Sequence, residues 1–175
     1  MSTVIKYLSG GDLRSIGKSN SVAAKVKTQK DFDDLFKCLY HHDRIVVMRA
    51  ADCIEKITSA KATYLTKYKM EILDLSRTST DKELVWHLAQ LIPRLNLNGN
   101  DFKEAWKILS RWALDKSCSR IVRVNSLEAL SHLVQRNDSA LKQFSDILSE
   151  LEQEKIPSIK ARIKRIKTHN EFLTH

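Results

Sequence analysis

The stretch "VVMRAADCIEKI", residues 46–57, decides the fold, because three further segments align with it without gaps. They are "LVWHLAQLIPRL" from Leu84, "VRVNSLEALSHL" from Val122 and "IKARIKRIKTHN" from Ile159. The starts of the four segments lie 38, 38 and 37 residues apart. So regular a spacing indicates a repeated structural unit, and periods of about 20 to 50 residues are typical of proteins built as stacks of similar units.

Each segment has the pattern of an amphipathic helix, with apolar residues at positions 0, 4, 7, 8 and 11. In the first segment these residues are Val46, Ala50, Cys53, Ile54 and Ile57. The fourth segment keeps only Ile159, Ile163 and Ile166 of the pattern. A terminal unit with a more polar outer side is what a stack of repeats needs as its cap.

A second helical pattern precedes each of these segments. The four stretches are "DFDDLFKCLYHH" from Asp31, "YLTKYKMEILDLS" from Tyr64, "DFKEAWKILSRWALD" from Asp101 and "ALKQFSDILSELEQE" from Ala140. Asp31 and Asp101 are predicted to be N-cap residues, because a carboxylate there accepts from free helix amides. We therefore expect one domain, residues 1–175, with an N-terminal extension and helix in residues 1–30 followed by antiparallel helix pairs at residues 31–60, 64–98, 101–136 and 140–170.

Three stretches, "VVMRAADCIEKI", "ELVWHLAQLIPRL" and "SRIVRVNSLEALSHL", resemble the second helices of HEAT repeats. The N-terminal "DLRSIGKSN" is similar to the start of small stand-alone HEAT-repeat proteins, and the resemblance covers roughly residues 12–170. It implies an all-α fold, a right-handed α-α superhelix of about four helix pairs plus an N-terminal helix, and a scaffold role in binding proteins. One branch of the HEAT-repeat proteins, the alkylpurine DNA glycosylases, binds damaged DNA, so the resemblance also allows a distant relation to these enzymes. Ser126 departs from the small apolar pattern, and Pro93 would kink its helix.

Composition favours the same fold class. Four glycines and two prolines in 175 residues leave few interruptions for helices. Three cysteines are an odd number without paired spacing, which argues against a disulfide framework and favours a reducing, cytoplasmic setting. No stretch has the length of a membrane span, so we expect no membrane partner. The net charge of +9 favours encounters with anionic partners.

The stretch "GGDLRSIGKS", residues 10–19, has the look of a phosphate-binding loop. The motif G-x-x-x-x-G-K-[ST] does not fit, because Gly11 and Gly17 enclose five residues, and Asp12 would stand where phosphate belongs. The preceding "VIKYL" reads as a strand without a partner strand. The stretch is therefore predicted to be a turn with a helix N-cap at Ser19 or Asn20.

The predicted binding face is the side of the second helices that points away from the apolar stripe. Positions 2, 3, 6 and 10 of the segments fall there. The predicted partner-binding residues are Met48, Arg49, Asp52, Trp86, His87, Gln90, Arg94 and Asn125. Trp86 beside arginine is a residue mix found at interface hot spots. Trp106 and Trp112 are predicted to lie in the core instead.

No catalytic or metal-binding residue is predicted. Cys38, His41 and His42 are too close together at one helix end to surround an ion. Asp52 and His87 have the residue types of an acid–base pair for catalysis, but the sequence offers no nucleophile and no oxyanion donors to act with them. We therefore expect no cofactor, no small-molecule substrate and no enzymatic activity.

The sequence supports two hypotheses of function. The first is a non-enzymatic scaffold that binds a protein or peptide partner through the face around Arg49, Trp86 and His87. The alternative is nucleic-acid binding, with phosphates at Arg49, Arg94, Arg162 and Arg165 and a base stacked on Trp86. The basic stretch 155–169, with six Lys or Arg and no acid, supports this alternative or serves as a solvated cap helix.

Overall fold

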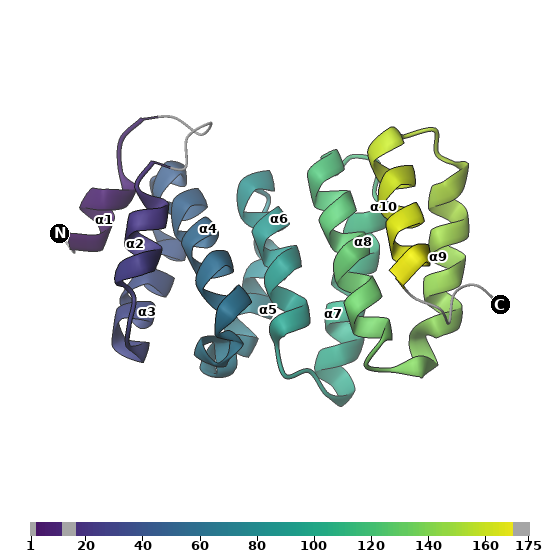
Figure 1. Cartoon of the computed structure of the whole chain (residues 1–175), viewed down its shortest axis with the longest axis horizontal. Helices are drawn as coiled ribbons and strands as arrows, with labels where there is room; N and C mark the ends of the chain where they lie inside the picture. Colours follow the sequence, from purple (N-terminus) through teal and green to yellow (C-terminus); the bar gives the residue numbers. More distant parts are fainter. Residues whose placement is uncertain (1–2, 12–16, 170–175) are drawn as a thin grey trace.

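The computed structural model describes residues 3–11 and 17–169, and every regular element within these ranges is helical (Figure 1). The α-helices are α1 (Thr3–Leu8), α2 (Ser19–Lys25), α3 (Gln29–Phe36), α4 (Arg44–Ala60), α5 (Lys69–Thr78), α6 (Lys82–Leu91), α7 (Gly99–Leu114), α8 (Arg120–Val134), α9 (Leu141–Gln153) and α10 (Pro157–His169). Short 3₁₀ helices are η1 (Lys37–Tyr40), η2 (Ala62–Tyr68), η3 (Ile92–Arg94) and η4 (Asp138–Ala140). The all-α prediction is confirmed for the described residues.

The helices alternate between two layers along the chain. We call α4, α6, α8 and α10 the second-helix layer; neighbouring members of this layer pack closely on one another (Figure 1). The first-helix layer, α3, α5, α7 and α9, packs against it. Each of the four predicted repeat ranges contains one α-helix from each layer, although α3 and α7 each begin two residues before their ranges. The repeated stripe therefore corresponds to the helices that contact one another along the stack.

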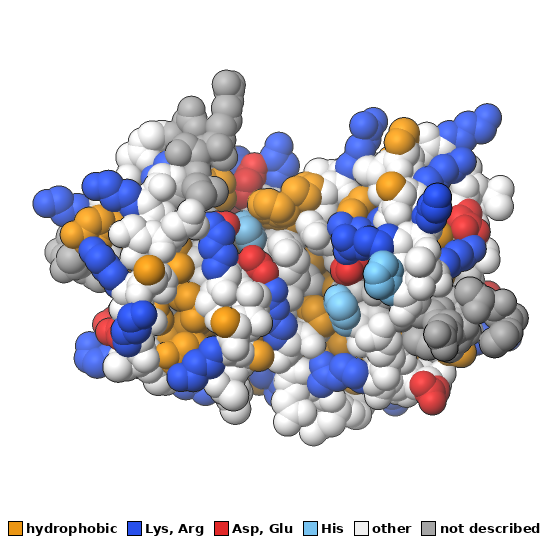
Figure 2. Space-filling view, viewed as in Figure 1, with side chains coloured by type: hydrophobic (Ala, Val, Ile, Leu, Met, Phe, Trp, Pro, Cys, Tyr) orange, Lys and Arg blue, Asp and Glu red, His pale blue; other side chains and the backbone are white. Residues whose placement is uncertain are grey.

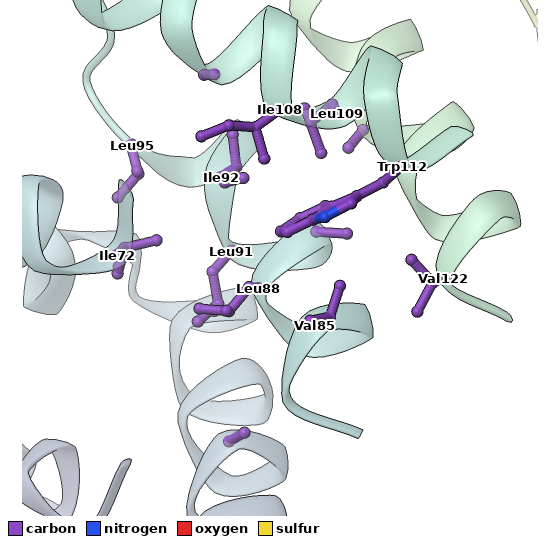
Figure 3. Close-up of a cluster of buried hydrophobic side chains, with 14 of the residues drawn as sticks. Ile72, Val85, Leu88, Leu91, Ile92, Leu95, Ile108, Leu109, Trp112 and Val122 are labelled. Carbon is purple, nitrogen blue, oxygen red and sulfur yellow. The ribbon is translucent and has the colours of Figure 1, made fainter. Parts of the chain in front are cut away.

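The core lies between the two layers, as Figure 3 shows for helices α5 to α8. Leu88 and Ile92 of the second apolar stripe are fully buried there. Trp112 of α7 projects among these side chains and is buried, as the sequence predicted, and so is Trp106. The stripe is buried because removing the apolar side of a helix from contact with water stabilises the folded state.

Two features of the helices differ from the sequence prediction. The "VIKYL" stretch, which reads as a lone strand, belongs to helix α1. Pro93 does not kink a continuous helix; α6 ends at Leu91, and Pro93 lies in the 3₁₀ helix η3. A proline has no N–H to donate and clashes with the preceding turn, so ending the α-helix before it removes the conflict.

None of the described helices has the length and apolarity needed to cross a membrane.

The predicted N-caps lie close to the real ones but are wrong. Helix α7 begins at Gly99 after the N-cap Asn98, so Asp101 stands in the first turn, where its carboxylate pairs with Lys69. The residue preceding α2 is Lys18, which makes no side-chain cap. Acidic residues are favoured throughout the first turn, which is why the type of residue alone could not select the position.

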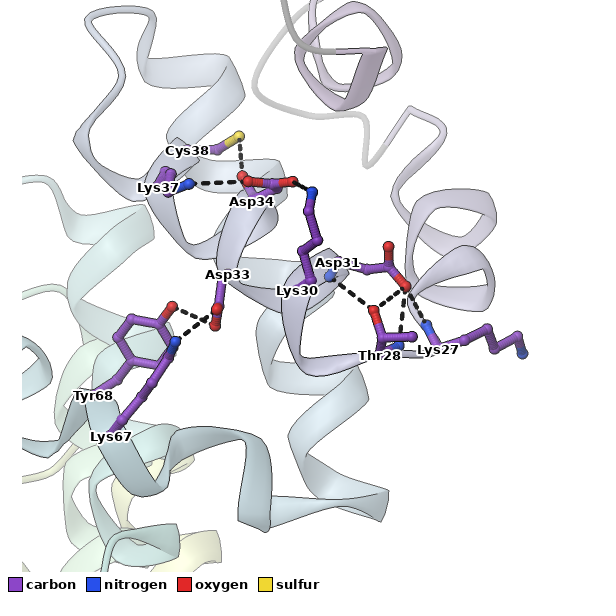
Figure 4. Close-up of polar contacts among 10 residues, drawn as sticks. All are labelled: Lys27, Thr28, Lys30, Asp31, Asp33, Asp34, Lys37, Cys38, Lys67 and Tyr68. Carbon is purple, nitrogen blue, oxygen red and sulfur yellow. Dashed lines mark hydrogen bonds and ion pairs between the residues drawn. The ribbon is translucent and has the colours of Figure 1, made fainter.

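The cap of α3 is Thr28, and Asp31 is its partner (Figure 4). The Thr28 Oγ1 accepts from the Asp31 N–H at 3.1 Å, and the Asp31 carboxylate accepts from the Thr28 N–H at 2.9 Å. This reciprocal capping box satisfies two amides that a helix start leaves without partners. The hydrogen bonds from Thr28 hold the pKa of Asp31 below its ordinary value.

Substitution of Thr28 by Ala is expected to lower the free energy of unfolding by about 1 kcal/mol, because the Asp31 N–H loses its acceptor. Urea denaturation followed by far-ultraviolet circular dichroism measures this loss. Thr80→Ala, an exposed threonine between α5 and α6, is the matched control and should change the stability by less than about 0.5 kcal/mol. Equal effects of the two substitutions would contradict the assigned cap.

Candidate functional site

Backbone carbonyl groups of the glycine-rich stretch near the N-terminus accept hydrogen bonds from the Arg49 guanidinium. Arg49 of α4 donates from Nη1 to the carbonyl oxygens of Leu8 at 2.8 Å, Ser9 at 3.3 Å and Gly10 at 2.5 Å. A phosphate loop would present N–H groups instead. Gly17 has φ +54°, a backbone conformation that favours glycine, and a Cβ there would lie 2.8 Å from the Arg49 Cζ. Asp12, the acid in the sequence argument, lies outside the described residues.

Arg49 therefore does not lie on an open binding face. Arg49 is only 2% exposed. Both predictions for Arg49, contact with a partner protein and contact with a phosphate, assumed an accessible guanidinium, and that assumption is wrong. The reason is tertiary. The N-terminal helices α1 and α2 both pack on α4 and cover the side of that helix that its own pattern leaves polar.

Met48 and His87 are buried as well, at 7% and 3% exposure, which corrects the prediction that they face solvent. The His87 ring lies 4.4 Å from the Trp86 ring, and its Nδ1 has no hydrogen-bond partner among the described residues. Burial lowers the pKa of His87 to about 4. Trp86 itself is half-buried, and it packs against the core.

Asp52 joins helices of the protein to one another. Its Oδ2 accepts from the Ser19 hydroxyl at 2.6 Å and from Lys56 Nζ at 2.6 Å. Lys56 also donates to the Asn20 side chain at 2.6 Å. This predicted partner-binding residue therefore connects α2 with α4 through short polar contacts.

The remaining predicted residues come together at another place. Gln90, Arg94 and Asn125 line one groove with Arg162 and Arg165, which the sequence assigned only to the nucleic-acid alternative. The groove has a volume of about 580 Å³, and its lining residues come from α6, η3, α8, α10 and the two residues that follow α8. Figure 2 shows basic, acidic and histidine side chains gathered on this face over α8 and α10. We call it the arginine groove.

A carboxylate stands at the centre of the charges in the arginine groove. Glu128 of α8 accepts from Arg162 Nη1 at 2.8 Å and from Arg165 Nη2 at 2.7 Å. Burial raises the pKa of Glu128, but the two guanidinium charges outweigh burial and hold that pKa below its ordinary value. His132 Nε2 lies 3.8 Å from the same carboxylate. Glu128 is therefore ionised and held between two cations.

Two further arginines line the groove. Arg94 pairs with Glu55 and donates to the Thr58 hydroxyl at 2.8 Å, and its side chain is 20% exposed. Arg136 is exposed and donates to the carbonyl oxygens of Pro93 at 2.8 Å and Leu95 at 3.3 Å, where η3 ends. The sequence prediction missed Arg136, because it follows the twelve-residue segment on which the repeats were aligned. Four arginines and one carboxylate among the described lining residues give the groove an excess of positive charge.

The arrangement suits anions and peptide groups. Guanidinium groups bind carboxylates through paired N–H donors, and side-chain amides both donate and accept hydrogen bonds.

Among residues 3–11 and 17–169, no group of three His, Cys, Asp or Glu side chains is placed to hold a metal ion. Of the histidine and cysteine cluster near residue 40, Cys38 contacts the Asp34 carbonyl, and His41 Nδ1 accepts from the Asp43 N–H.

Comparisons with known proteins add no family. A scan against protein-family models, a search of curated proteins and a search of solved structures each returned no match. The resemblance to HEAT repeats therefore remains a proposal that rests on the repeated segments quoted above.

Proposed function

We propose that this chain is a non-enzymatic binding module of the HEAT-like solenoid type, and that its arginine groove holds an acidic segment of a partner protein. The observation that carries the proposal is the meeting of Arg162 and Arg165 on one carboxylate, Glu128, inside an open groove. The 38-residue spacing and the layered helix pairs support the solenoid. Three free cysteines favour action in the reducing cytoplasm.

Glu128 supports a carboxylate ligand in particular, since it occupies the position that a glutamate or aspartate of the partner would take. The Arg165 side chain is 55% exposed, so it can leave Glu128 and pair with an incoming carboxylate. Arg162 is 19% exposed and would keep Glu128 neutralised meanwhile. Gln90 and Asn125 on the same walls supply amide groups for the backbone of an extended peptide.

The lining favours a peptide over a nucleic acid. Of the arginines in the nucleic-acid hypothesis, Arg49 is buried in the N-terminal turn and Arg94 is paired with Glu55. Stacking of bases needs an exposed aromatic face, but Trp86 is half-buried against His87.

Arg165→Gln is expected to weaken the binding of a fluorescein-labelled glutamate-rich decapeptide by at least about tenfold, because one charge-assisted pair is lost. Fluorescence anisotropy at two salt concentrations measures the affinity. Arg120→Gln removes the same charge from an exposed position on α8 outside the groove and should change the affinity less than about twofold.

Glu128→Gln should strengthen binding of the decapeptide, since it removes the internal competitor for the arginines. A single-stranded oligonucleotide is measured in parallel with every variant. The proposal is overturned if the peptide does not bind, if Arg120→Gln and Arg165→Gln act alike, or if the oligonucleotide binds more tightly with a steep salt dependence.

A further inference from the structure

We propose a second docking surface on the first-helix layer, between α7 and α9, whose occupant is an acidic amphipathic helix of a partner protein. A groove of about 860 Å³ lies there, with Phe102, Trp106 and Ile147 among its lining residues and Lys103, Lys107 and Lys142 around them. We call it the lysine groove. It shares no lining residue with the arginine groove, so the proposal does not depend on the function proposed above.

The lysine groove lies where α7 and α9 make few contacts with each other. Helix α7 packs extensively on α8 but only slightly on α9, whereas α8 and α10 pack closely in the other layer. The space left between α7 and α9 is bounded by side chains of both helices and by the turn that contains Asn137 and Ser139. It is therefore a channel between two helices rather than an opening into the core.

Aromatic packing makes the floor of the lysine groove firm. The Phe102 and Trp106 rings lie 5.9 Å apart and nearly parallel, and Trp106 meets Phe144 edge-on at 6.3 Å. Trp106 and Ile147 each retain 7% exposure, while Phe102 is half-buried. A floor held on several sides keeps its shape, so an apolar ligand side chain meets a preformed surface.

The charges around this floor select an acidic partner. Lys103, Lys107 and Lys142 are exposed, and none of them takes part in the ion pairs found between described residues. Asp146 is the one acid among the described residues that line the groove. A ligand with apolar side chains on one face and carboxylates beside them would match both the floor and the rim.

The length of the groove favours a helical ligand. Its α7 wall runs from Gly99 to Ser110, which is about 16 Å at the rise of an α-helix. Three turns of a ligand helix would place apolar anchors at i, i+4 and i+7 along this wall. Base stacking is disfavoured, because the Trp106 ring is packed against Phe102 and Phe144 and is almost fully buried.

The test uses a synthetic 14-residue peptide with leucines at i, i+4 and i+7 and glutamates flanking them, and a scrambled peptide of the same composition. The patterned peptide should bind saturably in fluorescence anisotropy. The double variant Lys103→Glu/Lys142→Glu should weaken its binding by at least about tenfold, because two attractions become repulsions. Asp146→Asn should strengthen the binding.

Two controls separate this surface from general charge and from the arginine groove. Lys116→Glu/Lys155→Glu makes the same change of charge at exposed positions outside the lysine groove and should leave the affinity nearly unchanged. Arg165→Gln should also leave it unchanged. Circular dichroism confirms that each variant is folded. The proposal is overturned if the scrambled peptide binds equally well, if both double variants act alike, or if a single-stranded oligonucleotide binds the groove more tightly than the patterned peptide.

Discussion

Arg123→Met is expected to lower the free energy of unfolding by about 3–5 kcal/mol, the largest effect of a single substitution considered for this protein. Arg123 is 3% exposed and makes a paired contact with Glu154, at 2.8 Å from Nη1 and 2.7 Å from Nη2. Its Nε also donates to the Ala113 carbonyl at 2.9 Å. The substitution leaves the carboxylate and the carbonyl without their donor.

The position of Arg123 explains the size of the effect. Ala113 lies in the last turn of α7, where carbonyl groups have no partner within the helix. Glu154 follows α9 directly, so one guanidinium joins the ends of α7 and α9 to the start of α8. Arg123 holds the pKa of Glu154 below its ordinary value through their hydrogen bonds, which shows that the carboxylate is stabilised in its charged form.

Urea denaturation of Arg123→Met, Glu154→Gln and the double variant Arg123→Met/Glu154→Leu measures this pair. The double variant should lose less stability than the sum of the single variants, because it leaves no buried charge without a partner. Arg120→Met, an exposed arginine in the same helix, is the matched control and should cost less than about 0.5 kcal/mol. A loss below about 1 kcal/mol for Arg123→Met would contradict the assignment.

The second large effect is expected at His87 as a dependence of stability on pH. Its pKa is 6.5 in an ordinary environment and about 4 in the folded protein, mainly because burial disfavours the charged ring. The unfolded chain therefore binds the proton more tightly than the folded one. The contribution is fully present above pH 6.5 and is lost as the pH falls toward 4, by up to about 3 kcal/mol.

The groups that face His87 act in both directions. Asp52 and Glu55 of α4 raise the pKa of His87, and Lys56 lowers it, but burial outweighs all three. Acidification of the protein should thus destabilise the contact between α4 and α6 first, since His87 lies on α6 and these groups lie on α4.

Stability curves of the unchanged protein and of His87→Leu, measured from pH 7 to pH 4, test this expectation. Their difference in free energy of unfolding should change by up to about 3 kcal/mol over that range, in favour of His87→Leu at the acidic end. His42→Leu, at an exposed histidine, is the matched control for the replacement of a histidine by leucine. Parallel curves for His87→Leu would show that His87 titrates in the same way in the folded and unfolded states.

Much of the fold could be predicted because its determinants are local. The apolar spacing of Leu84, Leu88 and Leu91 sets which side of α6 turns inward, and the same spacing recurs in α4 and α8. The burial of Trp106 and Trp112 followed from the same reasoning. The predicted N-caps were wrong, because Asp31 and Asp101 are favourable anywhere in a first turn, whereas the cap position depends on backbone geometry.

The candidate sites depended on contacts between distant segments, which the helical spacing of residues in the sequence does not show. Within α4 and α6 alone, Arg49 and His87 occupy the polar side, and the sequence therefore placed them in solvent. The tertiary structure buries Arg49 beneath a turn some 40 residues earlier in the chain and His87 against α4.

The sequence by itself determined the repeated helical pattern, the apolar side of the helices in the second-helix layer and the excess of positive charge, because these follow from residue types and their spacing. Only the tertiary structure decided which polar residues remain accessible and which come together. Arg94, Asn125 and Arg162 lie in three different segments of the chain, in η3, α8 and α10, and they share a groove because η3 and α10 both pack on α8. Accessibility is a property of what covers a helix, and the covering segments lie far away in the chain.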